Sequence, residues 1–131
     1  MKHRYIAGDL VRYIGVNTPR VVKIDEVREE CLILELTKDN CRWCLADYSE
    51  VEPIPLTLEV LTCNGWKWSD EHEEFSKHGV AIYPVGNYYR TDIFNMEIRY
   101  IHELQHLLFG LGLDNYMKMP KNYILPEGGE K

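Results

Sequence analysis

The residues His102-Glu103-Leu104-Gln105-His106 have the H-E-x-x-H spacing of zinc peptidases. Side chains four residues apart lie on one face of a helix, so His102 and His106 could bind one zinc ion together. Glu103 could then act as a general base on a metal-bound water. One function open to this chain is therefore that of a minimal zinc metallopeptidase, with two histidine ligands and one catalytic glutamate.

The rest of the sequence does not complete such a site. Catalytic zinc generally takes three protein ligands and a water. One extended form of the motif needs Gly three residues after the second histidine and a ligand three residues further on, but Phe109 and Gly112 stand there. Another form takes a Glu from a downstream helix, and the candidates, Glu127 and Glu130, lie in a Gly-rich tail. We therefore expect no metal and no other cofactor, and we predict that the chain is not an enzyme.

The motif lies in the strongest predicted helix, residues 100–111. Apolar side chains recur there at helical spacing: Tyr100, Ile101, Leu104, Leu107, Leu108 and Leu111. A helical wheel places them on one broad face and places His102 and His106 nearly opposite, beside Gln105 and Phe109. We therefore expect the apolar face to pack on a sheet and the two histidines to point into solvent.

Short strands separated by turns precede this helix in the first 55 residues. The strands are expected at 9–14, 20–27, 31–37, 42–45 and 49–54. Five short strands with short connections favour an SH3-like β-barrel over residues 1–55, because closure removes exposed strand edges.

Residues 56–119 are expected to form an α+β unit with a small antiparallel sheet. Thr57 is a candidate N-cap for a short helix that Asn64-Gly65 ends. Strands are expected from Trp66, at 79–85 and at 88–94, with an acidic loop at 69–74 and the helix 100–111 last. Residues 120–131 read as a flexible tail. The predicted fold class is therefore α+β, a barrel packed with a smaller sheet and two helices.

Composition limits the possible partners. The chain has 131 residues and a formal net charge of −6, which argues against broad binding to nucleic acid without excluding it. Positive charges gather in residues 1–28 and negative charges in residues 46–76. The sequence shows no apolar stretch of membrane length and no signal segment, so we expect a cytoplasmic protein that does not bind membranes. Nothing in it implies a small-molecule substrate.

Two further groups of residues could do chemistry. Cys41 and Cys44 form a C-x-x-C, but Cys31 and Cys63 have no such partner, so reduced, inert thiols are expected in place of a zinc site. A barrel face that carries Trp43 with Arg12, Arg20 or Arg42 could stack on single-stranded nucleic acid or hold a peptide. The SH3-like binding module is thus a second alternative function.

Two segments resemble a family of small uncharacterised proteins from gut Bacteroidetes and their phages or mobile elements. Val51–Leu61, followed by Asn64-Gly65-Trp66, is similar to the family pattern I-x-P-I-P-L-T-x-E-x-L-x-x-N-G-[FW], and Met96–Leu107 is similar to its ending I-x-Y-V-H-E-L-Q-N-L. The resemblance implies no activity. The family often has Asn at the position of His106, which implies that His106 is not a shared metal ligand.

The sequence-based prediction is therefore a small non-enzymatic interaction or accessory protein of phage or mobile-element origin. Its partner would be another protein or a second copy of the chain.

Overall fold

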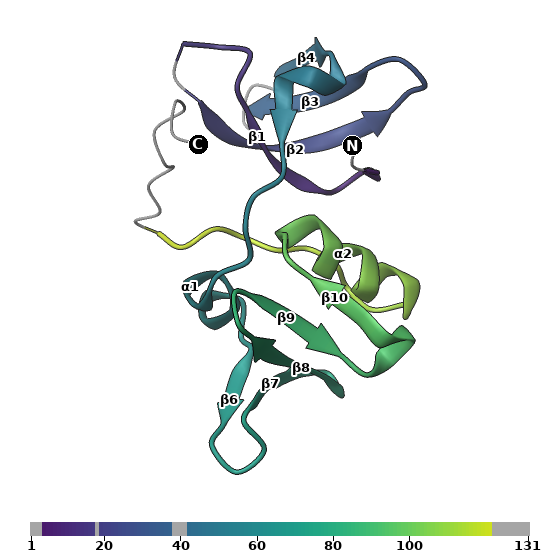
Figure 1. The fold of residues 1–131 in the computed structure, drawn as a ribbon. Coiled ribbons are helices and arrows are strands. Elements are labelled where there is room, and N and C mark those ends of the chain that lie inside the picture. The colour runs from purple at the N-terminus through teal and green to yellow at the C-terminus, as the bar shows by residue number, and fades with distance from the viewer. Residues whose placement is uncertain (1–3, 18, 38–41, 122–131) are drawn as a thin grey trace.

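The structure is a computed structural model that describes residues 4–17, 19–37 and 42–121. It is an α+β fold with two antiparallel sheets and few helices (Figure 1). The buried residues form two clusters, one inside the first sheet and one between the second sheet and the helices. No helix in the described part of the chain is long and apolar enough to cross a membrane.

The first sheet contains residues 10–52. Its elements are β1 (Leu10–Tyr13), β2 (Arg20–Val27), β3 (Leu32–Thr37), β4 (Arg42–Ala46), the 3-10 helix η1 (Tyr48–Glu50) and β5 (Val51–Glu52), in the sheet order β4-β3-β2-β1-β5. The first four predicted strands are found with shifts of one residue at most at their ends, whereas the fifth, expected at 49–54, is reduced to Val51–Glu52, because its first part forms η1. Apolar residues alternate along them, so Val11, Val22, Ile24 and Leu34 face one side and form its core.

Register shifts in β2 and β3 help this sheet to curl. They lie between Ile24 and Glu26 and between Glu35 and Thr37, and such bulges bend a strand and increase its twist. Strands β4 and β5 are the two edges, and among the described residues no pairing joins them. The sheet is therefore a curled half-barrel, and the closure expected from the sequence is not found there.

The second sheet contains residues 67–98 and has the order β10-β9-β8-β7-β6. Its strands are β6 (Lys67–Ser69), β7 (Glu74–Lys77), β8 (Val80–Val85), β9 (Tyr88–Thr91) and β10 (Met96–Ile98), with the 3-10 helix η2 (Ile93–Asn95) before the last. The sequence did not indicate β7, because one buried side chain, Phe75, stands among polar neighbours. It did not indicate β10 either, and the strand expected at 88–94 ends at Thr91, before η2.

Helix α1 (Leu58–Cys63) precedes this sheet and has the predicted ends. The Thr57 side chain accepts a hydrogen bond from the Val60 N–H at 3.3 Å, and Gly65 has a φ of +86°, which glycine adopts without strain. The Asn64 side chain also bonds both backbone groups of Lys118, at 2.8 Å and 2.9 Å. The chain after the second helix is thereby held against α1. Most of the tail predicted at 120–131 lies outside the described residues.

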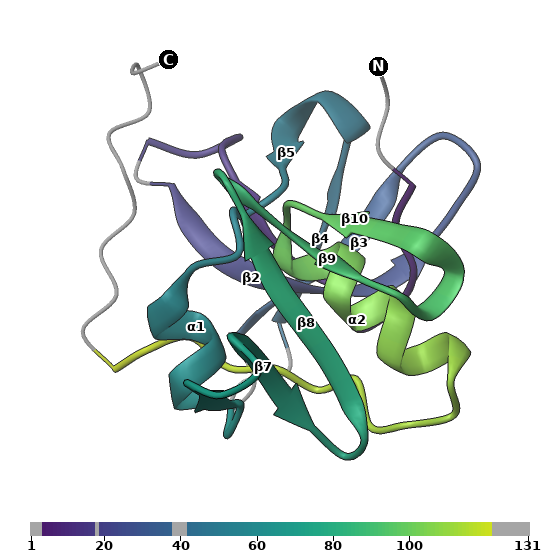
Figure 2. The same ribbon diagram turned by 60° about the horizontal axis from the view of Figure 1, so that its bottom comes forward.

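Helix α2 (Ile101–Gly110) carries the H-E-x-x-H motif and lies between the two sheets (Figures 1 and 2). Its leucine stripe packs on the second sheet as expected. The opposite side packs on β1, so the prediction that both histidines point into solvent is wrong: His102 is 2% exposed and His106 is half-buried. A wheel assumes one buried face, whereas this helix has a sheet on each side.

Candidate functional site

Glu103 is a helix cap in this structure. Its Oε1 accepts hydrogen bonds from the backbone N–H groups of Arg99 at 2.7 Å and Tyr100 at 3.1 Å. These N–H groups stand at the start of α2, where the backbone has no partner within the helix, and a carboxylate there also meets the positive end of the helix dipole. The glutamate is thus turned back along its own helix.

Gln105 joins α2 to the first sheet. Its Oε1 accepts from the Leu10 N–H at 2.9 Å, and its Nε2 donates to the carbonyl oxygens of Gly8 and Asn115, both at 3.0 Å. The side chain is 1% exposed, so these bonds are made out of water, where an unmade bond is costly. The wheel placed Gln105 on the solvent side, and nothing in the sequence showed that β1 would cover it.

His106 bonds a buried aspartate of the first sheet. Its Nε2 lies 2.7 Å from Asp9 Oδ2, which also accepts from the Ile6 N–H at 2.8 Å. His102 lies deeper, with its ring 5.0 Å from the Tyr5 ring and 5.4 Å from the His106 ring. Burial raises the pKa of Tyr5 to about 12, and the Asp9 carboxylate adds to the effect.

These residues bring polar groups together without forming a metal centre. Asp9 does approach His106, but in the described ranges 4–17, 19–37 and 42–121 no group of three or more His, Cys, Asp or Glu could hold a metal ion. Cys31, Cys44 and Cys63 are free thiols and half-buried, and Cys41 is outside the described residues. The motif of α2 therefore works as a junction between the sheets.

The structure does not group Trp43 with Arg12 and Arg20. Trp43 is 54% exposed and pairs across the strands with Glu35, on the outer face of the sheet. Arg12 lies on β1, three strands away in the sheet order, and bonds Glu52 at 2.9 Å. Arg20 pairs with Tyr13 and so belongs to the opposite face. The side chain of Arg42 is outside the described part.

An apolar pocket opens on the second sheet instead, with a volume of about 570 Å³. It is lined by Leu58 and Thr62 of α1 and by Trp66, Trp68, Phe75, Pro84 and Tyr89. Cross-strand pairing and alternation place Trp68, Phe75, Pro84 and Tyr89 on the face of the sheet that also carries the buried Ile82. The pocket is thus a part of the core-side face that the helices leave open.

The short length of α1 explains why this face is open. Six residues make a helix only about 9 Å long at 1.5 Å per residue. Five strands spaced about 4.8 Å apart span roughly 19 Å between the outer two. Helix α2 covers the β10 side, so the part of the face near β6 lies beyond both helices.

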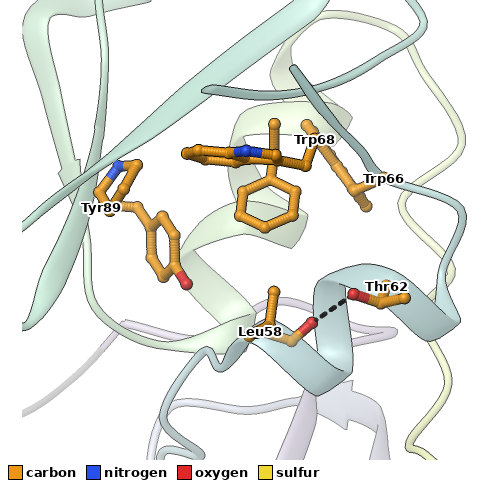
Figure 3. A pocket seen from close by; sticks show the side chains of 7 residues that line it. Leu58, Thr62, Trp66, Trp68 and Tyr89 are labelled. Carbon is orange, nitrogen blue, oxygen red and sulfur yellow. Dashed lines mark hydrogen bonds between the residues drawn. The ribbon is translucent and has the colours of Figure 1, made fainter. Parts of the chain in front are cut away.

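Trp68 is the exposed wall of the pocket. Its ring faces Leu58 and Thr62 across the cavity, with Tyr89 at one side (Figure 3). The indole Nε1–H donates to Asp70 Oδ1 at 2.7 Å, and the ring packs edge-on against Phe75 with centroids 4.9 Å apart. The ring is therefore held in place although 44% of the residue is exposed.

A second hollow of about 390 Å³ adjoins this pocket. Trp68 and Pro84 line both hollows, and the second adds Asp70, His72, Glu73 and Tyr83. An apolar site thus adjoins an acidic one. The tryptophans of this region were not predicted as site residues. The signal available was the run of acidic residues that begins two positions after Trp68.

Comparison of this chain with known protein families, with curated proteins and with solved structures finds no match.

Proposed function

We propose that this chain is a small non-enzymatic binding protein whose binding site is the apolar pocket around Trp68. The observation that carries the proposal is the combination of an open apolar cavity of about 570 Å³ with an exposed tryptophan whose ring is held by Asp70 and Phe75. Ligand pockets have volumes of roughly 300–1,000 Å³ and mainly apolar, aromatic walls. A pre-positioned tryptophan loses little entropy on binding and is a frequent anchor at interfaces.

The state of the H-E-x-x-H motif supports a non-enzymatic role over the peptidase alternative. Glu103 accepts two backbone hydrogen bonds, and His106 bonds Asp9. Gln105 fills the space between the sheets with three hydrogen bonds. Each of these contacts stabilises the fold, and a peptidase would need the glutamate and the imidazoles turned toward a substrate cleft.

We propose further that the first sheet is an incomplete SH3-like barrel that supports α2. The four-strand meander, the 3-10 helix η1 and the return of β5 to β1 support this reading. The alternative in which this sheet binds single-stranded nucleic acid has less support, because Arg12 and Arg20 do not share a free surface with Trp43. Phage or mobile-element origin remains a proposal that rests on the sequence resemblance.

Selection from a displayed library of random peptides tests the proposed site. The wild-type protein should enrich a consensus sequence, and the enriched peptides should lose binding to the Trp68→Ala and Leu58→Glu variants. Leu58 is exposed and lines the pocket from α1, so its substitution places a charge in the cavity without entering the core. Trp43→Ala is the matched control, an exposed tryptophan on the other sheet.

Thermal unfolding of all three variants should show that each still folds. Enriched peptides that bind Trp68→Ala and Leu58→Glu as well as the wild type would place the binding site elsewhere, and the proposal would be lost.

A further inference from the structure

We infer that the pocket takes an extended peptide segment in which an apolar side chain stands next to lysine or arginine. This inference rests on the proposed function and adds the class of ligand. The apolar side chain would enter the cavity between α1 and Trp68, and the neighbouring cation would lie in the second hollow, which Trp68 also lines. The two hollows share Trp68 and Pro84 as walls, so neighbouring residues of one peptide can reach both.

The charges around the second hollow favour a cation. Asp70 and Glu73 line it, and they belong to the run Asp70-Glu71-His72-Glu73-Glu74, which contains four carboxylates. His72 is the basic residue in its lining. A carboxylate pair beside an apolar wall attracts a cation and repels an anion, so the site discriminates by charge as well as by shape.

The cations in the strands of the second sheet have other partners or do not line the second hollow. The ammonium group of Lys77 donates to the carbonyl oxygen of Asn64, and Arg90 pairs with Glu97 at 3.6 Å. Lys67 precedes Trp68 in β6 and does not line the second hollow. The described residues of the second sheet thus leave Asp70 and Glu73 to a cation from a ligand.

The chemistry of lysine and arginine fits the wall that separates the hollows. Both side chains have an apolar stem that can lie on an indole ring while the charged end reaches a carboxylate. A cation over a tryptophan face is attracted by the ring as well. The strand that carries Trp68, β6, is an edge of its sheet, so an extended peptide can run beside it without displacing another strand.

Three acetylated pentapeptide amides test the inference: Gly-Lys-Phe-Lys-Gly, Gly-Gln-Phe-Gln-Gly and Gly-Glu-Phe-Glu-Gly. Binding is followed by NMR through the indole N–H signals of the protein, which has three tryptophans. The lysine peptide should shift the Trp68 indole signal and leave that of Trp43 in place. Its affinity should exceed that of the glutamine peptide by roughly tenfold, about threefold for each exposed carboxylate. The glutamate peptide should bind more weakly still.

The double variant Asp70→Asn, Glu73→Gln provides the matched control. It removes both charges and keeps an acceptor oxygen for the Trp68 indole. The preference for the lysine peptide should fall to less than about twofold in this variant, and in the wild type it should shrink when salt rises from 0.05 M to 0.5 M.

The outcomes separate the two proposals. Equal binding of all three peptides at Trp68 would retain the binding site and overturn the inference on charge. No shift of Trp68 with any peptide would overturn both. A Trp68 shift that follows protein concentration without peptide would identify a second copy of the chain as the occupant and would also overturn the inference.

Discussion

Replacing Gln105 should show how strongly the H-E-x-x-H helix holds the two sheets together. The side chain joins α2 to Leu10 of the first sheet, to Gly8 in the turn before that sheet and to Asn115 after the helix, and it is 1% exposed. Gln105→Met removes the three hydrogen bonds and keeps nearly the same volume. Gln105→Ala removes the bonds and leaves a cavity as well.

The expected loss follows from the groups left without partners. One backbone N–H and two carbonyl groups lose their bond, and each such partly buried group left unsatisfied costs about 1 kcal/mol. Gln105→Met should therefore lower the free energy of unfolding by about 3 kcal/mol, a large part of the roughly 5–15 kcal/mol typical of a domain. Gln105→Ala should lose about 1 kcal/mol more for its cavity, unless water enters.

Equilibrium unfolding in urea, followed by tryptophan fluorescence, measures both losses. Phe109→Ala is the control on the same helix, because Phe109 is 63% exposed and its change should stay within about 0.5 kcal/mol. A Gln105→Met variant within 1 kcal/mol of the wild type would refute the reasoning, since the hydrogen bonds would then contribute little.

Three further predictions concern the same junction. Glu103→Ala should lower the free energy of unfolding in urea by about 1 kcal/mol, and Glu103→Gln should lower it much less, because the amide oxygen can still accept the hydrogen bonds from the N–H groups at the start of α2. Equal losses in the two variants would contradict the capping role. Tyr5 should ionise near pH 12, two units above the usual 10, and the fold should lose stability as pH rises from 10 through 12, since the unfolded chain ionises first. In an absorbance titration of tyrosine ionisation, Tyr5→Phe should lack a step near pH 12 that the wild type shows. A variant that instead lacks a step near pH 10 would contradict the prediction. Protein purified without added zinc should contain no stoichiometric metal and should unfold at the same temperature with and without chelator. One equivalent of bound zinc would contradict this and would support His102 and His106 as metal ligands.

Local patterns in the sequence were enough to predict most of the elements. The limits of β2 and the N-cap of α1 were predicted correctly, because alternation and capping depend on neighbours in the chain. The polar strand β7 was missed, since Phe75 alone does not establish a period. The SH3-like closure was expected from strand count, which does not determine whether the edges β4 and β5 meet.

The helix junction and the pocket depend on tertiary placement, which local patterns do not contain. Gln105 and His102 looked like solvent-facing residues because the wheel cannot show that a second sheet covers the far side of α2. The sequence indicated a strand from Trp66 and no site at Trp68, whose ring packs on Phe75. Its exposure follows from the six-residue length of α1 beside a five-stranded sheet, a relation that appears only when the elements are assembled.

The most direct measurement of the central claim is the affinity of the lysine pentapeptide for the wild type, Trp68→Ala, Trp43→Ala and Leu58→Glu. It is measured by NMR titration through backbone amide signals, because Trp68→Ala lacks the Trp68 indole. Binding through the pocket predicts at least a tenfold loss for Trp68→Ala, a comparable loss for Leu58→Glu and no change for Trp43→Ala. Equal affinities for the wild type and Trp68→Ala, or a loss confined to Trp43→Ala, would contradict the claim that the pocket is the binding site.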